Sequence, residues 1–360
     1  MLKQIKNNIE KSIASFLKEV SLSYQFPKIA PELYLALKEY SLREGKRIRP
    51  TLFLLSYLGY AKRNRHLNSL YHASIGIEFL HNFMLIHDDI IDNSDLRRGK
   101  PTLHKILSRT IVSHDPQKLG NDLAIIAGDI IYALALEAFS SIKAPQKNKD
   151  AALKYFIQTT TFTALGEYVD TINGLKNLSQ VAEKDVFINY NLKTARYTFA
   201  SPLVLGAILA GAKNEEIKKL YQFGILIGEA FQIQDDIIGI FGSEKMIGKS
   251  ILSDLQENKK TILVTHAYQN LNPKELKIFK TIFNKPTKKL EDLARIKKLF
   301  IDAGSLAYSL KAVQSRINQA LKISAQLSMK RKYLTLIKDA TFEFFKQTNA
   351  IATENHITLR

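Results

Sequence analysis

The sequence contains no cysteine, and this absence excludes disulfide bonds and thiolate metal ligands together. It fits a reducing compartment. The first residues, MLKQIKNNIEKS, lack the apolar core of a secretory signal peptide. The longest charge-free apolar run, at 197–212, is shorter than the roughly twenty residues that a membrane-spanning helix needs. We therefore expect a soluble cytoplasmic protein without a membrane span.

Sequence patterns typical of β-strands are also scarce. Alternation of apolar and polar residues is nearly absent, and the single Asn173-Gly174 dipeptide follows a helical segment. Apolar residues instead recur every three or four positions, as in Leu52, Leu55 and Leu58. This period predicts an all-α protein with about ten or eleven helices. Because no long low-complexity linker and no fixed-period repeat interrupts the pattern, we expect one domain over residues 1–360.

Acidic residues are fewer than basic residues. The chain has 52 Lys and Arg against 34 Asp and Glu, which gives a formal net charge of +18. Such an excess favours an anionic partner, and nucleic acid, an acidic membrane surface or a phosphorylated substrate would each satisfy it. Charge alone does not choose among these partners, so the choice depends on the motifs.

One stretch, EFLHNFMLIHDDIIDNSDLRRG at 78–99, places aspartates at the end of an apolar run. Asp88 and Asp92 share one face of a helix, so they repel each other unless a cation lies between them. Carboxylates suit a hard metal ion, and Mg²⁺ commonly joins one or two of them to substrate phosphates. Arg97 and Arg98 add the guanidinium groups that bind a diphosphate. A helix cap or a solvated acidic patch is the alternative explanation.

A second apolar helical stretch, FQIQDDIIG at 231–239, also leads to paired aspartates, Asp235 and Asp236. We expect this cluster to supply metal ligands that the first cluster lacks. The polar stretch that follows carries Lys249 and Lys259. We expect it to form a lid over bound phosphates, and an ordinary solvated loop is the alternative.

A basic group near the N-terminus, EGKRIRP at 44–50, contains Lys46 and Arg49. His81 precedes Asp88 by two helical turns on the same face. Together with Arg98, these side chains would form a second anion pocket, distinct from the metal-bound one. The number of cationic groups fits two diphosphates better than one.

These segments resemble, in the same order, those of the trans-isoprenyl diphosphate synthases, the polyprenyl synthetase family. The resemblance covers about residues 40–265. Because the motifs occur together and in the family's order, the set is more specific than any single motif. The matching segments are GKRIRP at 45–50, HNFMLIHDDIID at 81–92, RRGKPTLH at 97–104, GD at 128–129, GEYVD at 166–170, KTARYT at 193–198, FQIQDD at 231–236, and GK with KKT within 248–261.

The resemblance implies an all-α bundle around a deep central cavity, normally as a homodimer. It implies that Asp88 and Asp92, with Asp235 opposite, bind about three Mg²⁺ ions that hold an allylic diphosphate. The catalytic and allylic-diphosphate-binding residues that it adds are Arg97, Lys193, Thr194, Gln232, Lys249 and Lys259. The isopentenyl diphosphate pocket that it implies consists of Lys46, Arg49, His81 and Arg98.

The implied reaction is prenyl transfer. Mg²⁺ and cationic side chains stabilise the departing diphosphate, so the allylic C–O bond ionises and leaves a carbocation. The isopentenyl double bond attacks this cation, and loss of a proton restores an alkene. No side-chain nucleophile is needed, which agrees with a sequence that contains no triad-like constellation.

Four positions depart from the common pattern of the family. Glu44 and Asn258 stand where glycine is frequent, and Glu167 stands where glutamine is frequent. Gly239 replaces the third aspartate of the second motif. The Gly239 departure leaves the second cluster with one metal ligand fewer.

Product length depends on the apolar shaft below Asp88, whose lining the resemblance assigns to Leu80, Phe83 and Met84. Phe83, five residues before Asp88, supplies bulk where the family places the floor of the shaft. The DDIID spacing carries no two-residue insertion, which resembles the archaeal-type enzymes that make twenty-carbon products. We expect geranylgeranyl diphosphate as the product, with farnesyl diphosphate as the alternative.

Three other readings remain at this point. A class I terpene cyclase also uses an aspartate-rich Mg²⁺ site, but it needs no second diphosphate pocket, so Lys46 and Arg98 argue against it. A nucleic-acid-binding or membrane-binding protein would explain the charge, yet carboxylates repel a phosphate backbone, so we expect no nucleic-acid partner. A catalytically weak partner subunit is disfavoured because the motif residues are all present in the sequence, namely Asp88, Asp92, Arg97 and Lys249.

Overall fold

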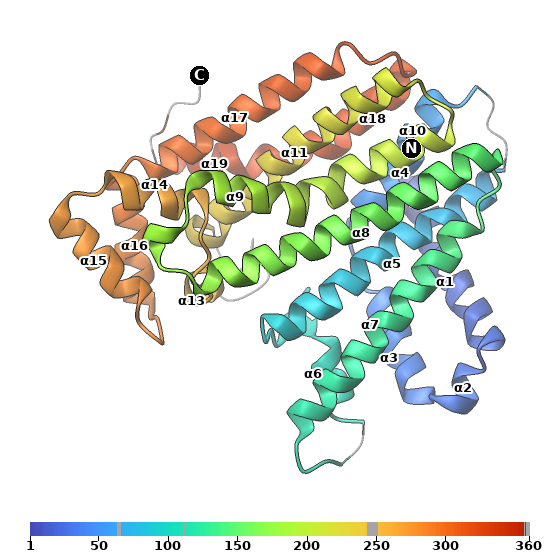
Figure 1. The fold of residues 1–360 in the computed structure, drawn as a ribbon, viewed down its shortest axis with the longest axis horizontal. Coiled ribbons are helices and arrows are strands. Elements are labelled where there is room, and N and C mark those ends of the chain that lie inside the picture. The colour runs from blue at the N-terminus through green and yellow to red at the C-terminus, as the bar shows by residue number, and fades with distance from the viewer. Residues whose placement is uncertain (63–65, 111, 243–250, 356, 358–360) are drawn as a thin grey trace. The chain divides into compact units, whose positions relative to one another are not determined.

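The computed structural model describes residues 1–360 except 63–65, 111, 243–250, 356 and 358–360. The chain divides into two compact units. Unit 1 consists of Met1–Ile157, Pro202–Lys213 and Met329–Ile337, and unit 2 of Gln158–Ser201, Asn214–Ser328 and Lys338–Arg360. Helices make up nearly all of the regular structure of both units (Figure 1), which confirms the predicted all-α class. The single domain over 1–360 stays a prediction.

Unit 1 contains the N-terminal helices and the structure's short β-hairpin. Its elements are α1 (Leu2–Ser23), α2 (Phe26–Ile29), α3 (Pro31–Ser41), α4 (Ile48–Tyr60), α5 (Leu67–Ile91), β1 (Leu96–Arg97), β2 (Lys100–Pro101), α6 (Leu103–Leu107) and α7 (Pro116–Ser140). Three helices have residues in both units: α8 (Gln146–Leu175), α10 (Ser201–Leu209) and α18 (Arg331–Phe342).

Unit 2 contains the remaining elements. They are η1 (Leu178–Gln180), α9 (Glu183–Asn189), η2 (Tyr190–Ala200), α11 (Asn214–Phe241), α13 (Ser253–Gln256), α14 (Ile262–Asn270), α15 (Pro273–Phe283), α16 (Leu290–Asp302), α17 (Ser305–Ser324), η3 (Glu343–Phe345) and α19 (Lys346–Glu354). The expected ten or eleven helices are therefore too few. Short helices such as α2 and α13 escape a periodicity search, because such a search needs a window of roughly 11–18 residues.

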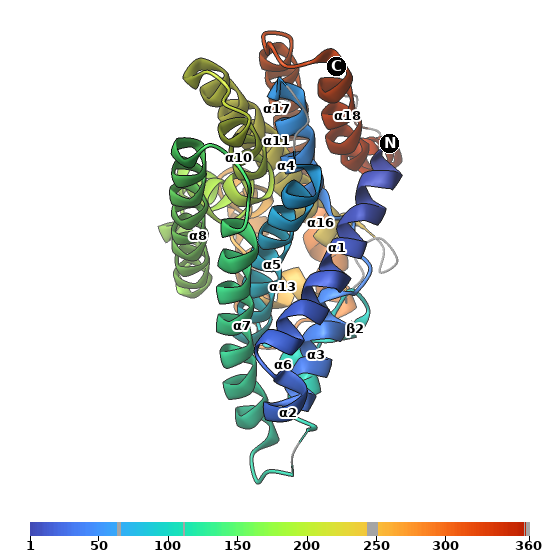
Figure 2. The same cartoon turned by 90° about the vertical axis from the view of Figure 1, so that its right-hand side faces the viewer.

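The core of unit 1 is built around α5 and α7, which lie side by side along their length (Figures 1 and 2). The α5 sequence is apolar on most of its circumference, which is typical of a helix surrounded by other elements. Phe79 and Ile75 of α5 and Phe139 of α7 are almost completely buried. This packing fixes α5 as a rigid support for the aspartates at its C-terminal end.

Helix α7 is the one described helix that is long and apolar enough to cross a membrane. By itself this is weak evidence, because a core helix of a soluble protein has the same length and composition. Ile125 and Ile126 are nevertheless 45% and 53% exposed on it. Part of α7 therefore presents apolar side chains at the surface of the single chain.

A β-hairpin follows α5, although the sequence shows almost no strand pattern. Strands β1 and β2 pair antiparallel, with Arg97 opposite Lys100. The two residues between them, Arg98 and Gly99, both have positive φ, at 56° and 73°. This is the backbone of a tight two-residue hairpin turn. Arginine rarely adopts such a conformation, and residues held in this way are frequent at functional sites.

The core of unit 2 is built around α11, which packs against both η2 and α17. Figure 1 shows α11 and α17 running side by side. Element η2 is a π-helix, a geometry that is rare and often marks functional sites. This π-helix contains the KTARYT segment, which is one of the motifs shared with the family.

Candidate active site

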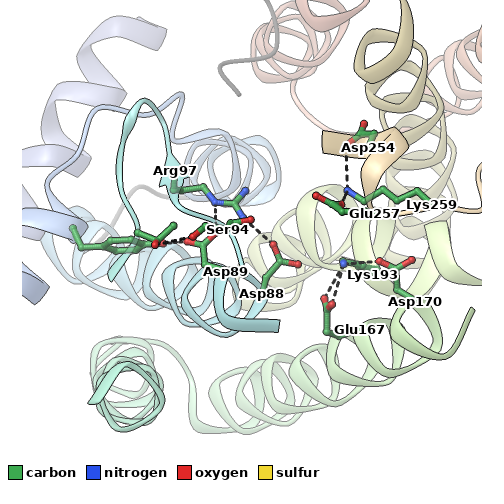
Figure 3. A network of polar contacts seen from close by, with 12 residues as sticks. Asp88, Asp89, Ser94, Arg97, Glu167, Asp170, Lys193, Asp254, Glu257 and Lys259 are labelled. Carbon is green, nitrogen blue, oxygen red and sulfur yellow. Dashed lines mark hydrogen bonds and ion pairs between the residues drawn. The ribbon is translucent and has the colours of Figure 1, made fainter. Parts of the chain in front are cut away.

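Asp88, Asp89 and Arg97 form one charged cluster at the C-terminal end of α5 (Figure 3). Arg97 Nη2 donates to Asp88 Oδ2 at 2.9 Å, and Arg97 Nε donates to Asp89 Oδ1 at 2.8 Å. The hairpin β1–β2 turns the chain back and so brings Arg97 to these carboxylates. Arg97 therefore lies beside the first aspartate motif, and its contact with Asp89 adds a residue to which the sequence analysis gave no role. The role of Arg97 in binding a diphosphate stays a prediction.

Asp89 is the buried member of this cluster. Its side chain is 1% exposed, whereas that of Asp88 is 17% exposed. Burial raises the pKa of Asp89 to about 6, although Arg97 acts in the opposite direction. Tyr40 of α3 also donates to Asp89, at 3.5 Å. Asp89 thus positions Arg97, while Asp88 and the half-buried Asp92 remain accessible to a ligand.

A second group of cationic side chains also lies in unit 1. Its predicted use as an anion pocket stays a prediction. Arg98 Nη1 donates to the carbonyl oxygen of Glu44 at 3.3 Å, and a β-carbon on Gly45 would lie only 2.8 Å from Arg98 Nη1. Arg98 therefore packs against the EGKRIRP segment. Lys46 of that segment is exposed, and Arg49 is half-buried.

His81 belongs to this cationic group. It is 8% exposed, and burial lowers its pKa well below the ordinary 6.5, with Arg49 and Arg98 lowering it further. Desolvation also lowers the pKa of Arg98, and repulsion by Arg47 and Arg49 adds to this effect. Mutual repulsion of this kind is relieved when an anion binds. Burial thus favours the neutral form of His81, so this side chain would offer a bound anion a hydrogen bond rather than a charge.

The three predicted shaft residues lie on α5, one to two turns before Asp88. Leu80 is 4% exposed, while Phe83 and Met84 are half-buried. The Phe83 ring packs against His87, with ring centroids 4.7 Å apart, and against Tyr132 of α7, at 5.0 Å. Sequence reasoning missed Tyr132, because it lies on another helix far along the chain.

In unit 2, Lys193 of the π-helix is held by two carboxylates of α8 (Figure 3). Its Nζ lies 3.0 Å from Glu167 Oε1 and 2.7 Å from Asp170 Oδ2. A β-carbon on Gly166 would lie 2.4 Å from the Lys193 backbone nitrogen. Glycine at 166 therefore allows the π-helix to approach α8 closely enough for these contacts.

Thr194 and Gln232 are joined by a hydrogen bond, and Gln232 also contacts a buried aspartate. Thr194 Oγ1 donates to Gln232 Oε1 at 2.7 Å, and Gln232 Nε2 donates to Asp236 Oδ1 at 3.1 Å. The hydroxyl of Tyr190 donates to the other oxygen of Asp236. Burial raises the pKa of Asp236 to about 8.

The paired aspartates of the second motif thus have different surroundings. Asp235 is exposed, whereas Asp236 is 4% exposed. Only Asp235 is therefore open to a solvent-borne metal ion, and Asp236 serves as a buried hydrogen-bond acceptor. A cavity of ≈ 60 Å³ brings Lys193, Thr194 and Gln232 together with Lys259.

Lys259 lies after α13, with its Nζ 2.9 Å from Glu257 Oε2 and 3.4 Å from Asp254 Oδ1. Lys249 falls within 243–250 and so lies outside the described residues. Its place in a lid stays a prediction.

Two departures from the family pattern have a local explanation. Asn258 has φ of 55°, and asparagine tolerates this left-handed region better than most residues other than glycine. Glu167 gives Lys193 a second carboxylate partner. Neither departure disturbs the backbone that carries the site.

The donor set fits Mg²⁺. Accessible carboxylates stand at the ends of α5 and α11, and carboxylate oxygen is the ligand type that this hard ion prefers. In the described part of the chain, no three His, Cys, Asp or Glu side chains form a ready metal cage. This agrees with Mg²⁺ chemistry, because the ion is usually held by one or two carboxylates plus substrate phosphates.

The polyprenyl synthetase family model matches residues 30–300 of the chain. The chain belongs to the polyprenyl synthetase family. It is 36% identical to the geranylgeranyl diphosphate synthase of Saccharolobus solfataricus over 80% of this chain and 82% of the relative. It is 31% identical to the enzyme of the same name from Sulfolobus acidocaldarius, over 93% and 97%.

A solved polyprenyl synthetase relative agrees in fold. The geranylgeranyl pyrophosphate synthase of Corynebacterium glutamicum, solved with isoprenyl diphosphate and magnesium, is 25% identical, with a TM-score of 0.89 over 96% of this chain and 99% of that one. As a polyprenyl synthetase, the protein is a prenyltransferase enzyme. The roles of its individual residues stay predictions.

Proposed function

We propose that the protein is a geranylgeranyl diphosphate synthase. It condenses isopentenyl diphosphate with dimethylallyl, geranyl or farnesyl diphosphate to give all-trans geranylgeranyl diphosphate. One observation supports the binding of two diphosphates. Arg97 and Arg98 are neighbours in the chain, yet Arg97 pairs with Asp88 and Asp89 while Arg98 packs against Glu44. This separation supports two distinct anion-binding places in unit 1, whereas a terpene cyclase would need only one.

The allylic diphosphate would be bound through Mg²⁺ at Asp88, Asp92 and Asp235, with about three ions per site as the family implies. When bound, Mg²⁺ supplies charge that stabilises the leaving diphosphate. The chain's own cations complete this binding. They are Arg97, Lys193, Lys249 and Lys259. Thr194 and Gln232, joined by their hydrogen bond of 2.7 Å, orient the reacting end of the substrate.

The isopentenyl diphosphate would bind to Lys46, Arg49, His81 and Arg98. Lys46, Arg49 and Arg98 would supply the charge, because burial keeps His81 neutral and leaves it as a hydrogen-bond partner. The apolar side chains below Asp88 then keep water away from the carbocation. Phe83, packed against His87 and Tyr132, is the residue that we assign as the floor of the shaft.

The test is product chromatography. Purified protein is incubated with Mg²⁺, labelled isopentenyl diphosphate and each allylic primer in turn, and the products are dephosphorylated and separated. We expect geranylgeraniol from every primer. Farnesol as the only end product would replace the proposal by its alternative, a farnesyl diphosphate synthase. Only thirty-carbon or longer chains would reject both. Diphosphate release from farnesyl diphosphate without isopentenyl diphosphate would instead indicate a terpene cyclase.

We also propose that the enzyme acts as a cytoplasmic homodimer. The exposed Ile125 and Ile126 on α7 support an apolar contact surface between two copies. Light scattering after gel filtration tests the stoichiometry, and a purely monomeric mass under assay conditions would contradict it. Cell fractionation tests the location, with activity expected in the soluble fraction rather than with membranes.

A further inference from the structure

Arg47 is a buried cation inside the basic segment EGKRIRP, next to Lys46 and two residues before Arg49. Its side chain is 0% exposed, whereas Lys46 is exposed and Arg49 is half-buried. Arg47 directly precedes α4 and has φ of 48°, which arginine rarely adopts. Such a conformation persists only where the surrounding contacts hold it.

The guanidinium group of Arg47 makes contacts to three segments of unit 1. Its Nη1 donates to Glu78 Oε1 of α5 at 2.6 Å, and its Nε donates to Glu10 Oε1 of α1 at 2.7 Å. Its Nη2 donates to the backbone carbonyl oxygens of Ser41 and Arg43, at 3.1 Å and 2.8 Å. One side chain therefore joins α1 and α5 to the segment that leads into the basic motif.

The two carboxylates paired with Arg47 lie in different surroundings. The side chain of Glu10 is 30% exposed, so water can solvate its charge. The side chain of Glu78 is 2% exposed, and a buried carboxylate is costly unless a cation compensates it. Glu78 therefore depends on its contact with Arg47 much more than Glu10 does.

Glu78 lies beside the predicted isopentenyl diphosphate pocket. It precedes His81 by three residues on α5, so the two side chains share one face of the helix. Burial lowers the pKa of Arg98, and among the charged neighbours Glu78 acts on that pKa most strongly, in the opposite direction. A carboxylate at this place without compensation would repel a diphosphate and would also compete with it for Arg98.

We propose that Arg47 is a positioning residue of the isopentenyl diphosphate pocket, because it neutralises the buried Glu78 and so leaves Arg98 available to the diphosphate. The proposal rests on the function proposed above. Arg47 itself would not touch the substrate, because its guanidinium group is already committed to Glu78, Glu10 and two backbone carbonyls.

A purely structural ion pair is the alternative explanation, and the two single variants of the pair distinguish them. Arg47→Met and Glu78→Gln break the same ion pair, so a structural role predicts that both change substrate binding in the same direction. Neutralisation of Glu78 predicts opposite directions instead. Arg47→Met leaves the carboxylate uncompensated, whereas Glu78→Gln leaves the pocket with more positive charge.

The test measures KM for each substrate with the other one saturating. In Arg47→Met, KM for isopentenyl diphosphate should rise at least about tenfold, the effect of losing one charged hydrogen bond to the diphosphate. Its kcat should change little, because the lost interaction binds substrate and transition state alike. Its KM for farnesyl diphosphate should stay near that of the wild type. In Glu78→Gln, KM for isopentenyl diphosphate should fall below that of the wild type.

Two further variants complete the test. The double variant Arg47→Met/Glu78→Met replaces both buried partners by apolar side chains, which is often close to neutral. Its KM for isopentenyl diphosphate should therefore return close to the wild-type value. Glu10→Gln is the matched control, because it removes a carboxylate from the same Arg47 and leaves Glu78 neutralised, so both KM values should be unchanged.

Three results would overturn the proposal: a KM for isopentenyl diphosphate that is unchanged in Arg47→Met, one that rises in Glu78→Gln, or equal rises in both KM values. Thermal unfolding identifies any variant that has lost its fold. If Arg47→Met does not fold, Glu78→Gln and the double variant decide the question.

The outcome is separable from that of the proposed function. If the wild type forms no prenyl product from isopentenyl diphosphate, the proposed function fails. If the wild type forms the product and Arg47→Met shows the wild-type KM values, only the role of Arg47 fails.

Discussion

Arg97 Nη2 and Asp88 Oδ2 are joined by an ion pair of 2.9 Å within unit 1. Both residues are assigned to the same substrate, Asp88 through a metal ion and Arg97 by direct contact. Without ligand they therefore neutralise each other. Under the proposed function, a Mg²⁺-diphosphate complex would replace this ion pair by two new ones, so the cluster would exchange partners instead of burying an unpaired charge.

Replacing Arg97 tests this exchange. In Arg97→Gln, Asp88 loses its competing cation, so we expect Mn²⁺ to bind several-fold more tightly in the absence of diphosphate. Turnover should nevertheless fall by about 10²–10³, because a cation that stabilises the leaving diphosphate is lost. Metal titration and kcat with farnesyl diphosphate measure the two effects.

The neighbouring arginine is the control for this prediction. Arg98→Gln removes the same charge, but Arg98 packs against Glu44 instead of Asp88, so its Mn²⁺ affinity without diphosphate should be unchanged. Weaker Mn²⁺ binding by Arg97→Gln would contradict the assigned competition.

The two diphosphate pockets should respond separately to mutation. Lys193→Gln removes a charged contact to the allylic diphosphate, so its KM for that substrate should rise at least tenfold, as expected from about 1.5–3 kcal/mol for a charged hydrogen bond. Its KM for isopentenyl diphosphate should stay within twofold. Arg49→Gln should show the reverse pattern. Initial rates with one substrate saturating give both constants, and equal rises in both would refute two distinct pockets.

Phe83 should limit product length. Phe83→Ala removes the ring that packs against Tyr132 and His87, so the growing chain should extend by at least one five-carbon unit. Chromatography of the dephosphorylated products measures this change. Tyr132→Phe keeps the ring contact and serves as the control with an unaltered product. If Phe83→Ala still ends at twenty carbons, Phe83 is not the floor.

Asp236 should give the metal-free protein a specific pH dependence. Its pKa is raised from 3.8 to about 8 in the folded state, so between these values the folded chain keeps a proton that the unfolded chain has released. Because the unfolded state binds fewer protons, the free energy of unfolding decreases as pH rises through this window. The slope is at most about 1.4 kcal/mol per pH unit.

The variant Asp236→Asn lacks this proton. Urea unfolding in the presence of a chelator, at pH 5, 6, 7 and 8, should show the wild type losing stability relative to Asp236→Asn as pH rises. A constant offset from altered hydrogen bonds does not affect this comparison of slopes. If the difference in unfolding free energy between the wild type and Asp236→Asn stays constant with pH, or if the wild type gains stability relative to the variant as pH rises, a raised pKa for Asp236 is excluded.

The sequence predicts those features that depend on residues close together in the chain. Helical periodicity is local, so the all-α class and the aspartates near the end of α5 follow from it. The β-hairpin escapes prediction because its strands are two residues long and the first residue of its turn is Arg98 at positive φ, where asparagine or glycine is usual. The π-helix carries no distinctive periodicity of its own.

Contacts between distant segments are the part that sequence reasoning misses. Lys193 and Glu167 both lie in motifs that the sequence singles out, but their ion pair joins separate helices. Asp89 stands next to Asp88 in the same motif, and only burial distinguishes its role. In the sequence, Gly239 stands where the family motif has a third aspartate. In the structure, the carboxylate of Asp254 occupies the space that a side chain at position 239 would need. The signal for this contact is the glycine itself, because a close approach of two segments is a common reason for glycine in a helix.

The central proposal, which the family resemblance implies, is that Asp88 and Asp235 bind Mg²⁺ ions on one allylic diphosphate. A crystal structure of the enzyme with Mg²⁺ and an unreactive thiol analogue of farnesyl diphosphate tests it most directly. We predict that metal ions bound to the same diphosphate are coordinated by both Asp88 and Asp235, with Arg97 and Lys193 on its oxygens. A diphosphate whose metal ions contact only one of these two aspartates, or neither, would contradict the account.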